Sequence, residues 1–253
     1  MNPFSLENKT ILITGASSGI GRSIAVECSK MGARIIIIGR NSERLSETYN
    51  MLCGNEHIQI VADIDKQEDI DAIVTGIPVV DGLVNNAGIS HTKPISFLKD
   101  DEVINLFQTN FFSQIRLTKT LMKKKKMNGG ASIVFMSSMA ALNPEFGNSI
   151  YGASKAALKT FMLSCAKEFA PKHIRANAIH PGMVKTPLVE ALNFDEETTS
   201  KINYKSLSQC ANQYAPLFMF SLKNKRIIIH INPKDYDTSY IYTLTKFLEN
   251  IHF

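Results

Sequence analysis

Residues 9–31 constrain the fold of this chain more than any other segment. Residues 9–14 (KTILIT) form a short apolar run with β-branched residues, which is typical of a buried strand. A glycine-rich turn follows at residues 15–21 (GASSGIG), and residues 22–31 have a helix-like composition. A strand, a glycine-rich turn and a helix in this order bring backbone N–H groups and a helix N-terminus up to a pyrophosphate. The chain therefore begins with the pattern of a dinucleotide-binding unit.

The spacing of the glycines narrows this interpretation. The turn reads GxxxGxG rather than the more common GxGxxG, and no Gly-Lys-Ser/Thr sequence is present, so a P-loop nucleotide hydrolase is disfavoured. An isolated pattern of this kind is also compatible with an ordinary tight turn. The second strand-like run, residues 34–39 (RIIIIG), and the residues that end it favour the dinucleotide interpretation.

Strand-like and helix-like segments alternate along the rest of the chain. Further strands are predicted at residues 34–39, 57–62, 81–86, 132–136, 174–179 and 226–231. Helices are predicted from Ser42, whose hydroxyl is expected to cap the helix, and at residues 66–76, 100–126 and 150–170. Strands joined by crossover helices form a parallel sheet with right-handed connections. The predicted fold is therefore α/β: a single-domain, Rossmann-like doubly wound parallel sheet over residues 1–253, with helices on both faces.

Three residues in the second half of the chain can together move a proton onto a carbonyl oxygen. Tyr151 follows Ser138 by thirteen residues and precedes Lys155 by four. On a helix, a spacing of four places the phenol and the ammonium on one face. The ammonium is expected to lower the pKa of the phenol from about 10 toward the working pH. Ser138 can hydrogen-bond the same carbonyl, whereas the neighbouring Ser137 is expected on the opposite face of its strand.

The chain contains an internal control for this triple. Tyr242 and Lys246 have the same spacing of four, but the residue thirteen positions before Tyr242 is Ile229, which has no hydroxyl. The spacing of tyrosine and lysine alone is therefore weak evidence. The informative pattern is the complete triple.

These motifs together resemble the short-chain dehydrogenase/reductases over residues 6–188. Residues 14–21 (TGASSGIG) resemble the cofactor turn of that family, and residues 85–88 (NNAG) resemble its strand end. Asn110 falls where the family has a helix asparagine, the triple matches its catalytic residues, and residues 181–186 match the segment that closes over the nicotinamide. Within the family, the length of the chain and the tight spacing of serine and tyrosine are most similar to the 3-oxoacyl-carrier-protein reductases.

The resemblance implies a role for each matched residue. Tyr151 donates a proton, Ser138 steadies the carbonyl oxygen, and Lys155 keeps the phenol acidic and holds the nicotinamide ribose. Asn110 completes the catalytic set by holding a water through which Lys155 reaches solvent. The residues predicted to bind the cofactor are Gly15, Ser17, Ser18, Gly19, Ile20, Gly21, Arg40, Asp63, Ile64, Asn86, Ala87, Gly88, Tyr151, Lys155, Pro181, Gly182, Val184 and Thr186.

The end of the second predicted strand indicates which cofactor is used. Enzymes of this build that prefer NAD usually place an acidic residue there, which repels a 2′-phosphate. This chain has Gly39 followed by Arg40, whose guanidinium can clamp the phosphate through bidentate, charge-assisted bonds. The alternative is that Arg40 is only a solvated loop cation. NADP(H) is therefore the predicted cofactor, and the resemblance places Asp63 at the adenine amino group with Ile64 beside the ring.

The sequence thus predicts an NADP(H)-dependent oxidoreductase that transfers a hydride between the nicotinamide and a carbonyl or secondary alcohol. A 3-oxoacyl thioester is the favoured substrate, and a sugar, a steroid or another small ketone stays open. The alternative from a different class is a non-catalytic NADP(H)-binding protein that uses the fold for sensing or assembly. The complete set of Asn110, Ser138, Tyr151 and Lys155 argues against that alternative.

Composition and spacing exclude several other classes. The six histidines are dispersed without an HExxH sequence, so no catalytic metal is expected. The four cysteines are far apart without a CxxC, which predicts neither a zinc site nor a disulfide framework. A net charge of +5 without aromatic interleaving gives no reason to expect nucleic acid binding. No signal peptide is recognised and no apolar run approaches the ~18 residues of a spanning helix, so a cytoplasmic protein without a membrane segment is expected.

Residues 123–126 are four consecutive lysines at the end of a predicted helix. Cations at that position complement the helix dipole and stay hydrated. A docking patch for an acidic carrier protein is the alternative that the sequence leaves open.

The C-terminal part departs from the family pattern. Family members usually end in a strand followed by an aspartate and two glycines at a subunit interface, whereas here the strand at residues 226–231 runs into Asn232 and a proline. A helix is predicted at residues 238–250, within an atypical extension of residues 233–253. Residues 187–217 are predicted to form a variable substrate lid. A homo-oligomer, either a dimer or a tetramer, is expected.

Overall fold

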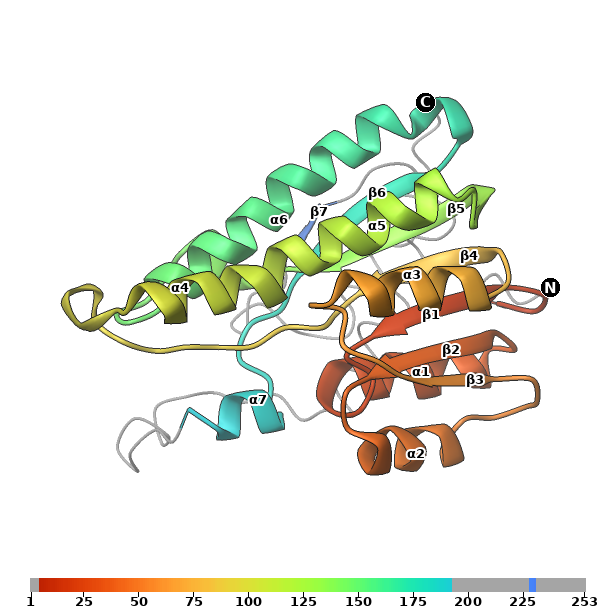
Figure 1. Cartoon of the computed structure of the whole chain (residues 1–253), viewed down its shortest axis with the longest axis horizontal. Coiled ribbons are helices and arrows are strands. Elements are labelled where there is room, and N and C mark those ends of the chain that lie inside the picture. The colour runs from red at the N-terminus through yellow and green to blue at the C-terminus, as the bar shows by residue number, and fades with distance from the viewer. Residues whose placement is uncertain (1–4, 193–227, 231–253) are drawn as a thin grey trace, which may run out of the picture.

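The apolar, β-branched runs of the sequence pair into one parallel sheet in the computed structural model, which describes residues 5–192 and 228–230 (Figure 1). Its strands are β1 Thr10–Thr14, β2 Arg34–Gly39, β3 Ile58–Val61, β4 Val80–Asn85, β5 Met127–Met136, β6 Arg175–His180 and β7 Ile228–His230. They lie in the order β3-β2-β1-β4-β5-β6-β7, and each pair of neighbours is parallel. The predicted fold class is confirmed.

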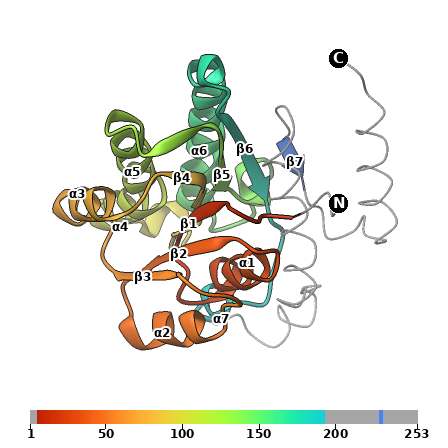
Figure 2. The same cartoon turned by 90° about the vertical axis from the view of Figure 1, so that its right-hand side faces the viewer.

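Helices connect the strands and cover both faces of the sheet. They are α1 Gly19–Lys30, α2 Ser42–Asn50, α3 Gln67–Gly76, α4 Asp100–Phe107, α5 Ser113–Lys123, α6 Ser149–Glu168 and the single turn α7 Pro187–Glu190. Short 3-10 segments lie at Ile95–Phe97, Met139–Ala141 and Ala170–Lys172. Helices α1 and α2 lie on one face of the sheet, and α3, α5 and α6 lie on the other (Figure 2). Their hydrophobic side chains belong to two separate core clusters, one on each face.

The four isoleucines of β2 show how a continuous apolar run becomes a strand that is buried on both sides. Successive side chains of a strand point to opposite faces. Ile35 and Ile37 join the core beneath α1 and α2, whereas Ile36 and Ile38 join the core beneath α3, α5 and α6. All four side chains are buried. Each face of the sheet therefore has its own hydrophobic layer, as a parallel sheet requires.

The side of the sheet on which successive strands are added changes between β1 and β4. Strands β2 and β3 extend the sheet on one side of β1, and β5, β6 and β7 extend it on the side of β4. Because all neighbouring pairs are parallel, the carboxyl ends of the strands lie at one edge. Ligands of such sheets bind beyond that edge at the point of reversal. The residues that follow β1, β2, β3 and β4 are therefore brought to one place.

One helix start and one helix cap differ from the predicted ones. Helix α1 begins at Gly19, inside the glycine-rich turn, rather than at Arg22. Helix α2 is capped by Asn41, not by Ser42, because the Asn41 side chain accepts a hydrogen bond from Arg44 N at 2.8 Å. A capping residue has an extended backbone and bonds back to the first turn. Asn41 holds that position, and Ser42 is already the first helical residue.

The helix predicted at residues 100–126 is interrupted in its middle. Gln108–Phe112 form a π-helical turn between α4 and α5, and α5 ends at Lys123. A π turn of this kind inserts an extra residue into a helix and is frequent at functional sites. Strand β5 then begins at Met127, earlier than predicted, and carries a bulge opposite the start of β4.

Strand β7 lies within the strand predicted at residues 226–231. The helix expected at residues 238–250 and the greater part of the predicted lid lie outside the described residues. Within the described part of the chain, no helix combines the length and the apolar character that a membrane span needs.

Candidate active site

The glycine-rich turn after β1 packs against the residues that follow β4. Gly15 and Gly19 have φ angles of 63° and 56°, a region that residues with a Cβ rarely adopt. A Cβ at Gly15 would lie 2.8 Å from Ala87 Cα, and one at Gly21 would overlap both Asn86 Nδ2 and Gly15 O. The turn therefore approaches the backbone of the neighbouring loop more closely than any side chain would allow.

Hydrogen bonds between Thr14 and Asn86 fix this contact. The Asn86 side chain donates to Thr14 O and Gly15 O, both at 3.1 Å. In return, Thr14 Oγ1 accepts from Asn86 N at 3.0 Å and from Ala87 N at 3.1 Å. Thr14 belongs to the motif quoted from the sequence but was not among the predicted site residues. The feature of the sequence that could have identified Thr14 as a site residue is its position at the end of the first strand.

Arg22 ties the same turn to helix α2. Its Nη2 donates to Ser17 O at 2.6 Å and to Arg44 O at 3.0 Å, and its Nε donates to Thr48 Oγ1 at 2.9 Å. The Thr48 hydroxyl in turn donates to Ala16 O at 2.9 Å. Sequence reasoning missed this network, because it joins residues that are far apart in the chain and share no recognised motif.

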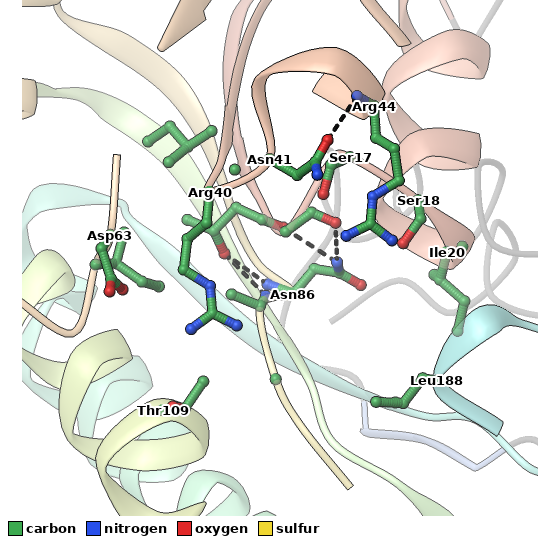
Figure 3. A pocket seen from close by; sticks show the side chains of 18 of the residues that line it. Ser17, Ser18, Ile20, Arg40, Asn41, Arg44, Asp63, Asn86, Thr109 and Leu188 are labelled. Atoms are coloured by element: carbon green, nitrogen blue, oxygen red, sulfur yellow. Dashed lines mark hydrogen bonds between the residues drawn. The ribbon is translucent and has the colours of Figure 1, made fainter. Parts of the chain in front are cut away.

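A cavity of about 280 Å³ opens at the carboxyl edge of the sheet, above the turn (Figure 3). The predicted residues that line it are Gly15, Ser17, Ser18, Gly19, Ile20, Arg40, Asp63, Ile64, Asn86, Ala87, Gly88 and Thr186. Lining residues that were not predicted include Asn41, Arg44, Asp65, Thr109, Pro187 and Leu188. The structure thus brings together side chains that follow β1, β2, β3 and β4 with others from the start of α7.

Six of the residues predicted to bind the cofactor do not line this cavity: Tyr151 and Lys155 lie next to it, and the other four lie elsewhere. Gly21 lies beneath the turn, against Asn86. Val184 is buried and its side chain packs into the core beneath α1. Pro181 contacts the other part of the site, because its carbonyl accepts a hydrogen bond from Met139 N at 2.9 Å. Gly182, which follows it, does not line the cavity either.

The predicted triple of Ser138, Tyr151 and Lys155 is assembled next to the cavity. Ser138 follows β5, and the other two residues lie in the first turns of α6. The Tyr151 side chain is hydrogen-bonded to that of Ser138, and Lys155 Nζ lies 5.8 Å from the centre of the Tyr151 ring. Lys155 Nζ also donates to the carbonyl of Met136, at 3.0 Å.

The electrostatics of this triple differ from those predicted. Burial raises the pKa of Tyr151 above its ordinary value of 10.0, and the hydrogen bond with Ser138 only partly opposes this rise. Burial also lowers the pKa of Lys155 to about 8. The expectation that Lys155 lowers the pKa of the phenol is therefore wrong for this structure. The ammonium lies over the face of the ring and is directed at the Met136 carbonyl, so it does not offset the loss of solvation around the phenol.

Ser137 has a structural contact that the sequence did not indicate. It was expected on the face of its strand away from the site. Its buried hydroxyl instead donates to the backbone carbonyl of Lys155 at 2.9 Å. Lys155 is therefore held to the end of β5 twice, through its backbone by Ser137 and through its ammonium by the Met136 carbonyl.

Asn110 lies in the π-helical turn and braces the loop after β4. Its Oδ1 accepts from Ile89 N at 2.8 Å, and its Nδ2 donates to Ile89 O at 2.9 Å and to Ser154 Oγ at 3.2 Å. Both amide hydrogens are thus committed to protein partners. The side chain fixes the loop against α6, and the water-holding role implied by the resemblance stays a prediction.

Gly88 joins the cavity to the triple. It lines the cavity, and a Cβ at this position would lie 3.1 Å from Asn110 Oδ1 and 3.2 Å from Lys155 Nζ. A side chain at position 88 would crowd both of these groups. The cavity and the Ser–Tyr–Lys triple therefore form one continuous site.

The groups in this site fit a nicotinamide dinucleotide. The glycine cradle leaves space and N–H donors for a pyrophosphate at the start of α1, as such units do. The Asp63 carboxylate and Arg40 guanidinium, both lining the cavity, offer an acceptor for an amino group and a cation for a phosphate. Within residues 5–192 and 228–230, no group of three or more metal-binding side chains is found.

The run of four lysines lies away from this site. Lys123 ends α5, and the next three residues lead into the amino end of β5. Lys126 Nζ is bonded to the carbonyls of Thr75 and Ile77. The run therefore lies at the edge of the sheet opposite the cavity, which gives no support to a carrier-docking patch beside the active site.

Comparison with known proteins agrees with this geometry. The family model described as short chain dehydrogenase matches residues 9–197. A 3-oxoacyl-[acyl-carrier-protein] reductase of Rickettsia bellii is 32% identical over 235 residues, which cover 90% of this chain and 96% of the relative.

Solved structures give the same result. A 3-ketoacyl-(acyl-carrier-protein) reductase of Brucella melitensis, complexed with NADH, has a TM-score of 0.80 at 26% identity, covering 91% of this chain and 99% of its own. A variant of the actinorhodin polyketide ketoreductase with NADPH has a TM-score of 0.79 at 26% identity, covering 91% and 97%.

Proposed function

Because this chain belongs to the short-chain dehydrogenase/reductase family, we propose that it is an NADP(H)-dependent reductase in which Tyr151 is the proton donor. The protein is an oxidoreductase that acts on a carbonyl or alcohol substrate. The single observation that carries the proposal is the Ser138–Tyr151–Lys155 triple, which meets the cavity at Gly88. Bound NADP(H) supplies or accepts the hydride.

The raised pKa of Tyr151 suits a proton donor. At neutral pH the phenol keeps its proton, and its hydrogen bond with Ser138 orients the hydroxyl. A carbonyl oxygen that receives negative charge accepts this proton, while the Ser138 hydroxyl donates a second hydrogen bond to the same oxygen. Lys155 contributes a cation beside the ring and donors for the ribose hydroxyls. Asn110 keeps the loop after β4, and with it Gly88, in place.

The preference for NADP(H) rests on the end of β2. Gly39 contributes no acid, and Arg40 lines the cavity with an exposed guanidinium. A 2′-phosphate would find a cation there and no competing carboxylate from position 39. The family neighbours include complexes with NADH and with NADPH, so the choice within the family depends on such side chains.

We propose a 3-oxoacyl thioester as the substrate class, which is supported by the names of the Rickettsia and Brucella reductases. The test is to follow NADPH oxidation by absorbance with acetoacetyl thioesters, simple ketones and sugar ketones, and to repeat the panel with NADH. The expected result is the highest kcat/KM for the thioester with NADPH. Turnover that favours another ketone would keep the enzyme assignment and replace the substrate.

The non-catalytic alternative has no support from the relatives, which are named as reductases and oxidoreductases. A complete absence of turnover over the same panel, with NADPH still bound, would restore it.

A homo-oligomer stays part of the proposal. Residues 238–250 carry apolar side chains at helical spacing, and leaving them in water costs about 25 cal/mol per Å². In symmetric oligomers a neighbouring subunit covers such a surface. Deletion of residues after Pro233 is expected to lower the oligomeric state measured by light scattering. An unchanged oligomer would assign assembly to other surfaces.

A further inference from the structure

The cavity contains a second arginine to which no role has been given. Arg44 lies in the first turn of α2 and lines the cavity together with Ser17, Arg40 and Asn41. Both arginine side chains are exposed, and neither guanidinium forms a hydrogen bond or an ion pair with the residues that the structure describes. A guanidinium has five N–H donors in a fixed fork. All ten donors of this pair are therefore available to a ligand.

The two guanidiniums lie on different sides of the cavity (Figure 3). That of Arg40 extends toward Asp63 and Thr109, whereas that of Arg44 lies beside Ser17 and Ser18. An anion that enters between them meets a cation from each side. The hydroxyl of Ser17 lies at the Arg44 side and offers a further donor.

Charge gives the cavity two unlike ends. Asp63 and Asp65, which line it at the end of β3, carry negative charge and favour the amino group of an adenine over an anion. Arg44 lies at the side away from Asp63 (Figure 3). A phosphate is repelled from the first end and attracted to the second, with Arg40 between them.

The backbone of Arg44 is fixed without the help of its guanidinium. Arg44 N donates to Asn41 Oδ1 at 2.8 Å, and Arg44 O accepts from Arg22 Nη2 at 3.0 Å. The same Arg22 nitrogen donates to Ser17 O at 2.6 Å. Arg22 thus holds Arg44 next to Ser17, and the Arg44 side chain can be shortened without loss of any of these bonds.

We propose that Arg44 is a second phosphate-binding residue of the cofactor site, which with Ser17 takes the 2′-phosphate of NADP(H) opposite Arg40. The proposal rests on the NADP(H) preference given above and adds a residue to it. Two guanidiniums from the loop after β2 and from the start of α2 enclose the phosphate dianion. The selectivity for NADP(H) over NAD(H) is then shared between them.

The test is calorimetric binding of 2′,5′-ADP and of ADP to the full-length protein. This pair probes the 2′-phosphate without a nicotinamide and without turnover. Arg44→Ala is expected to weaken 2′,5′-ADP about tenfold, as the loss of a charge-assisted bond does, and to leave ADP nearly unchanged. Arg44→Lys should recover part of the loss, because lysine keeps the charge but not the fork. The Arg40→Ala, Arg44→Ala double variant should lose the discrimination between the two ligands.

The control is Lys123→Ala, which removes one positive charge at the opposite edge of the sheet. It should bind both ligands as the wild type does, and melting temperatures should show that all variants are folded. Wild-type affinity of Arg44→Ala for 2′,5′-ADP, alongside a loss in Arg40→Ala, would overturn the role of Arg44 and leave the NADP(H) preference intact. Equal losses for both ligands would overturn it as well. A wild type that does not distinguish 2′,5′-ADP from ADP would overturn the NADP(H) preference itself.

Discussion

The catalytic triple and the rim of the cavity lie at the same edge of the sheet, but they are built by opposite means. Around Lys155, buried groups are committed to protein partners: its ammonium bonds to Met136 O, and Ser137 bonds to its carbonyl. At the rim, Arg40 and Arg44 are exposed and have no partner in the described part of the chain. Proton transfer by the triple therefore depends on contacts that form when the protein folds. The affinity for the cofactor depends instead on charges that form ion pairs only with a bound ligand.

This contrast predicts that substitutions separate into two kinds. Changes around the triple should lower kcat or stability and leave the affinity for NADPH nearly constant, except at Lys155, which is also proposed to bind the ribose. Changes at the rim should alter the affinity for NADPH and leave kcat nearly constant.

The largest expected effect is that of Tyr151→Phe. Loss of the proton donor should lower kcat by about a thousandfold, in the range typical of general acid catalysis. The dissociation constant for NADPH should stay within a few-fold, because the ring and Lys155 remain. Steady-state kinetics and calorimetry measure the two quantities. Tyr49→Phe, which removes a partly exposed hydroxyl bonded to His57 O, is the control and should affect neither. Substantial turnover in Tyr151→Phe would show that Tyr151 is not the proton donor.

The second effect concerns the pH dependence of stability. The pKa of Lys155 falls from 10.5 to about 8 on folding. Between these values the unfolded chain holds one more proton than the folded chain, so the free energy of unfolding rises with pH. Below pH 8 Lys155 is protonated in both the folded and the unfolded chain, so the burial of its ammonium lowers the free energy of unfolding by the full amount.

Lys155→Met removes this titration. Without cofactor, the free energy of unfolding of the wild type relative to this variant should increase by about 3 kcal/mol as the pH rises from 8 to 10.5. Urea titrations at a series of pH values measure it. Since Tyr151 is present in both proteins, its own titration largely cancels. A difference that does not vary with pH would show that the ammonium is well solvated or paired.

Gly21→Ala should affect both stability and the affinity for NADPH, because Gly21 supports the cofactor turn through a buried contact. Its new Cβ would overlap Asn86 Nδ2 and Gly15 O, and overpacking of this kind costs about 1–3 kcal/mol. The melting temperature and the affinity for NADPH should therefore fall together. Gly76→Ala is the matched control, since a Cβ there meets nothing within 4 Å. Loss of affinity without loss of stability would mean that the turn adjusts at no cost.

The smallest effect is expected for Ser137→Ala. It leaves the buried Lys155 carbonyl without the Ser137 bond and should lower the free energy of unfolding by about 1 kcal/mol. The pH profile of kcat should also shift, because Lys155 is less firmly placed. Ser164→Ala, on the exposed part of α6, should change neither. A stability loss with an unchanged profile would make Ser137 a purely structural residue.

Much of the fold could be predicted from the sequence. The apolar runs of β1 and β2 and the glycine turn between strand and helix are local patterns, and they determine the parallel sheet and its reversal. The ends of the helices were harder to predict, because they depend on which of several neighbouring residues forms the capping hydrogen bond. Asn41 rather than Ser42 caps α2, and the π turn at Gln108–Phe112 has no local signal in the hydrophobic pattern.

The candidate site divides in the same way. Ser138, Tyr151, Lys155 and the glycines were predicted from spacing, and the structure brings them together. The sign of the Tyr151 pKa shift was not predictable, because it depends on how burial compares with the position of the ammonium. Arg44 and Arg22 were missed, because their importance follows from where α2 lies against the turn.

The close contact at Gly39 makes the cofactor preference epistatic. A Cβ at Gly39 would lie 3.2 Å from both Ser17 Oγ and Leu45 Cδ1. An aspartate introduced there to favour NAD(H) would therefore require Ser17 or Leu45 to shift by a few tenths of an ångström. Removal of the cations of Arg40 and Arg44 requires no such shift, because both side chains are exposed. The effect of a substitution at position 39 on cofactor preference therefore depends on the side chain at position 17.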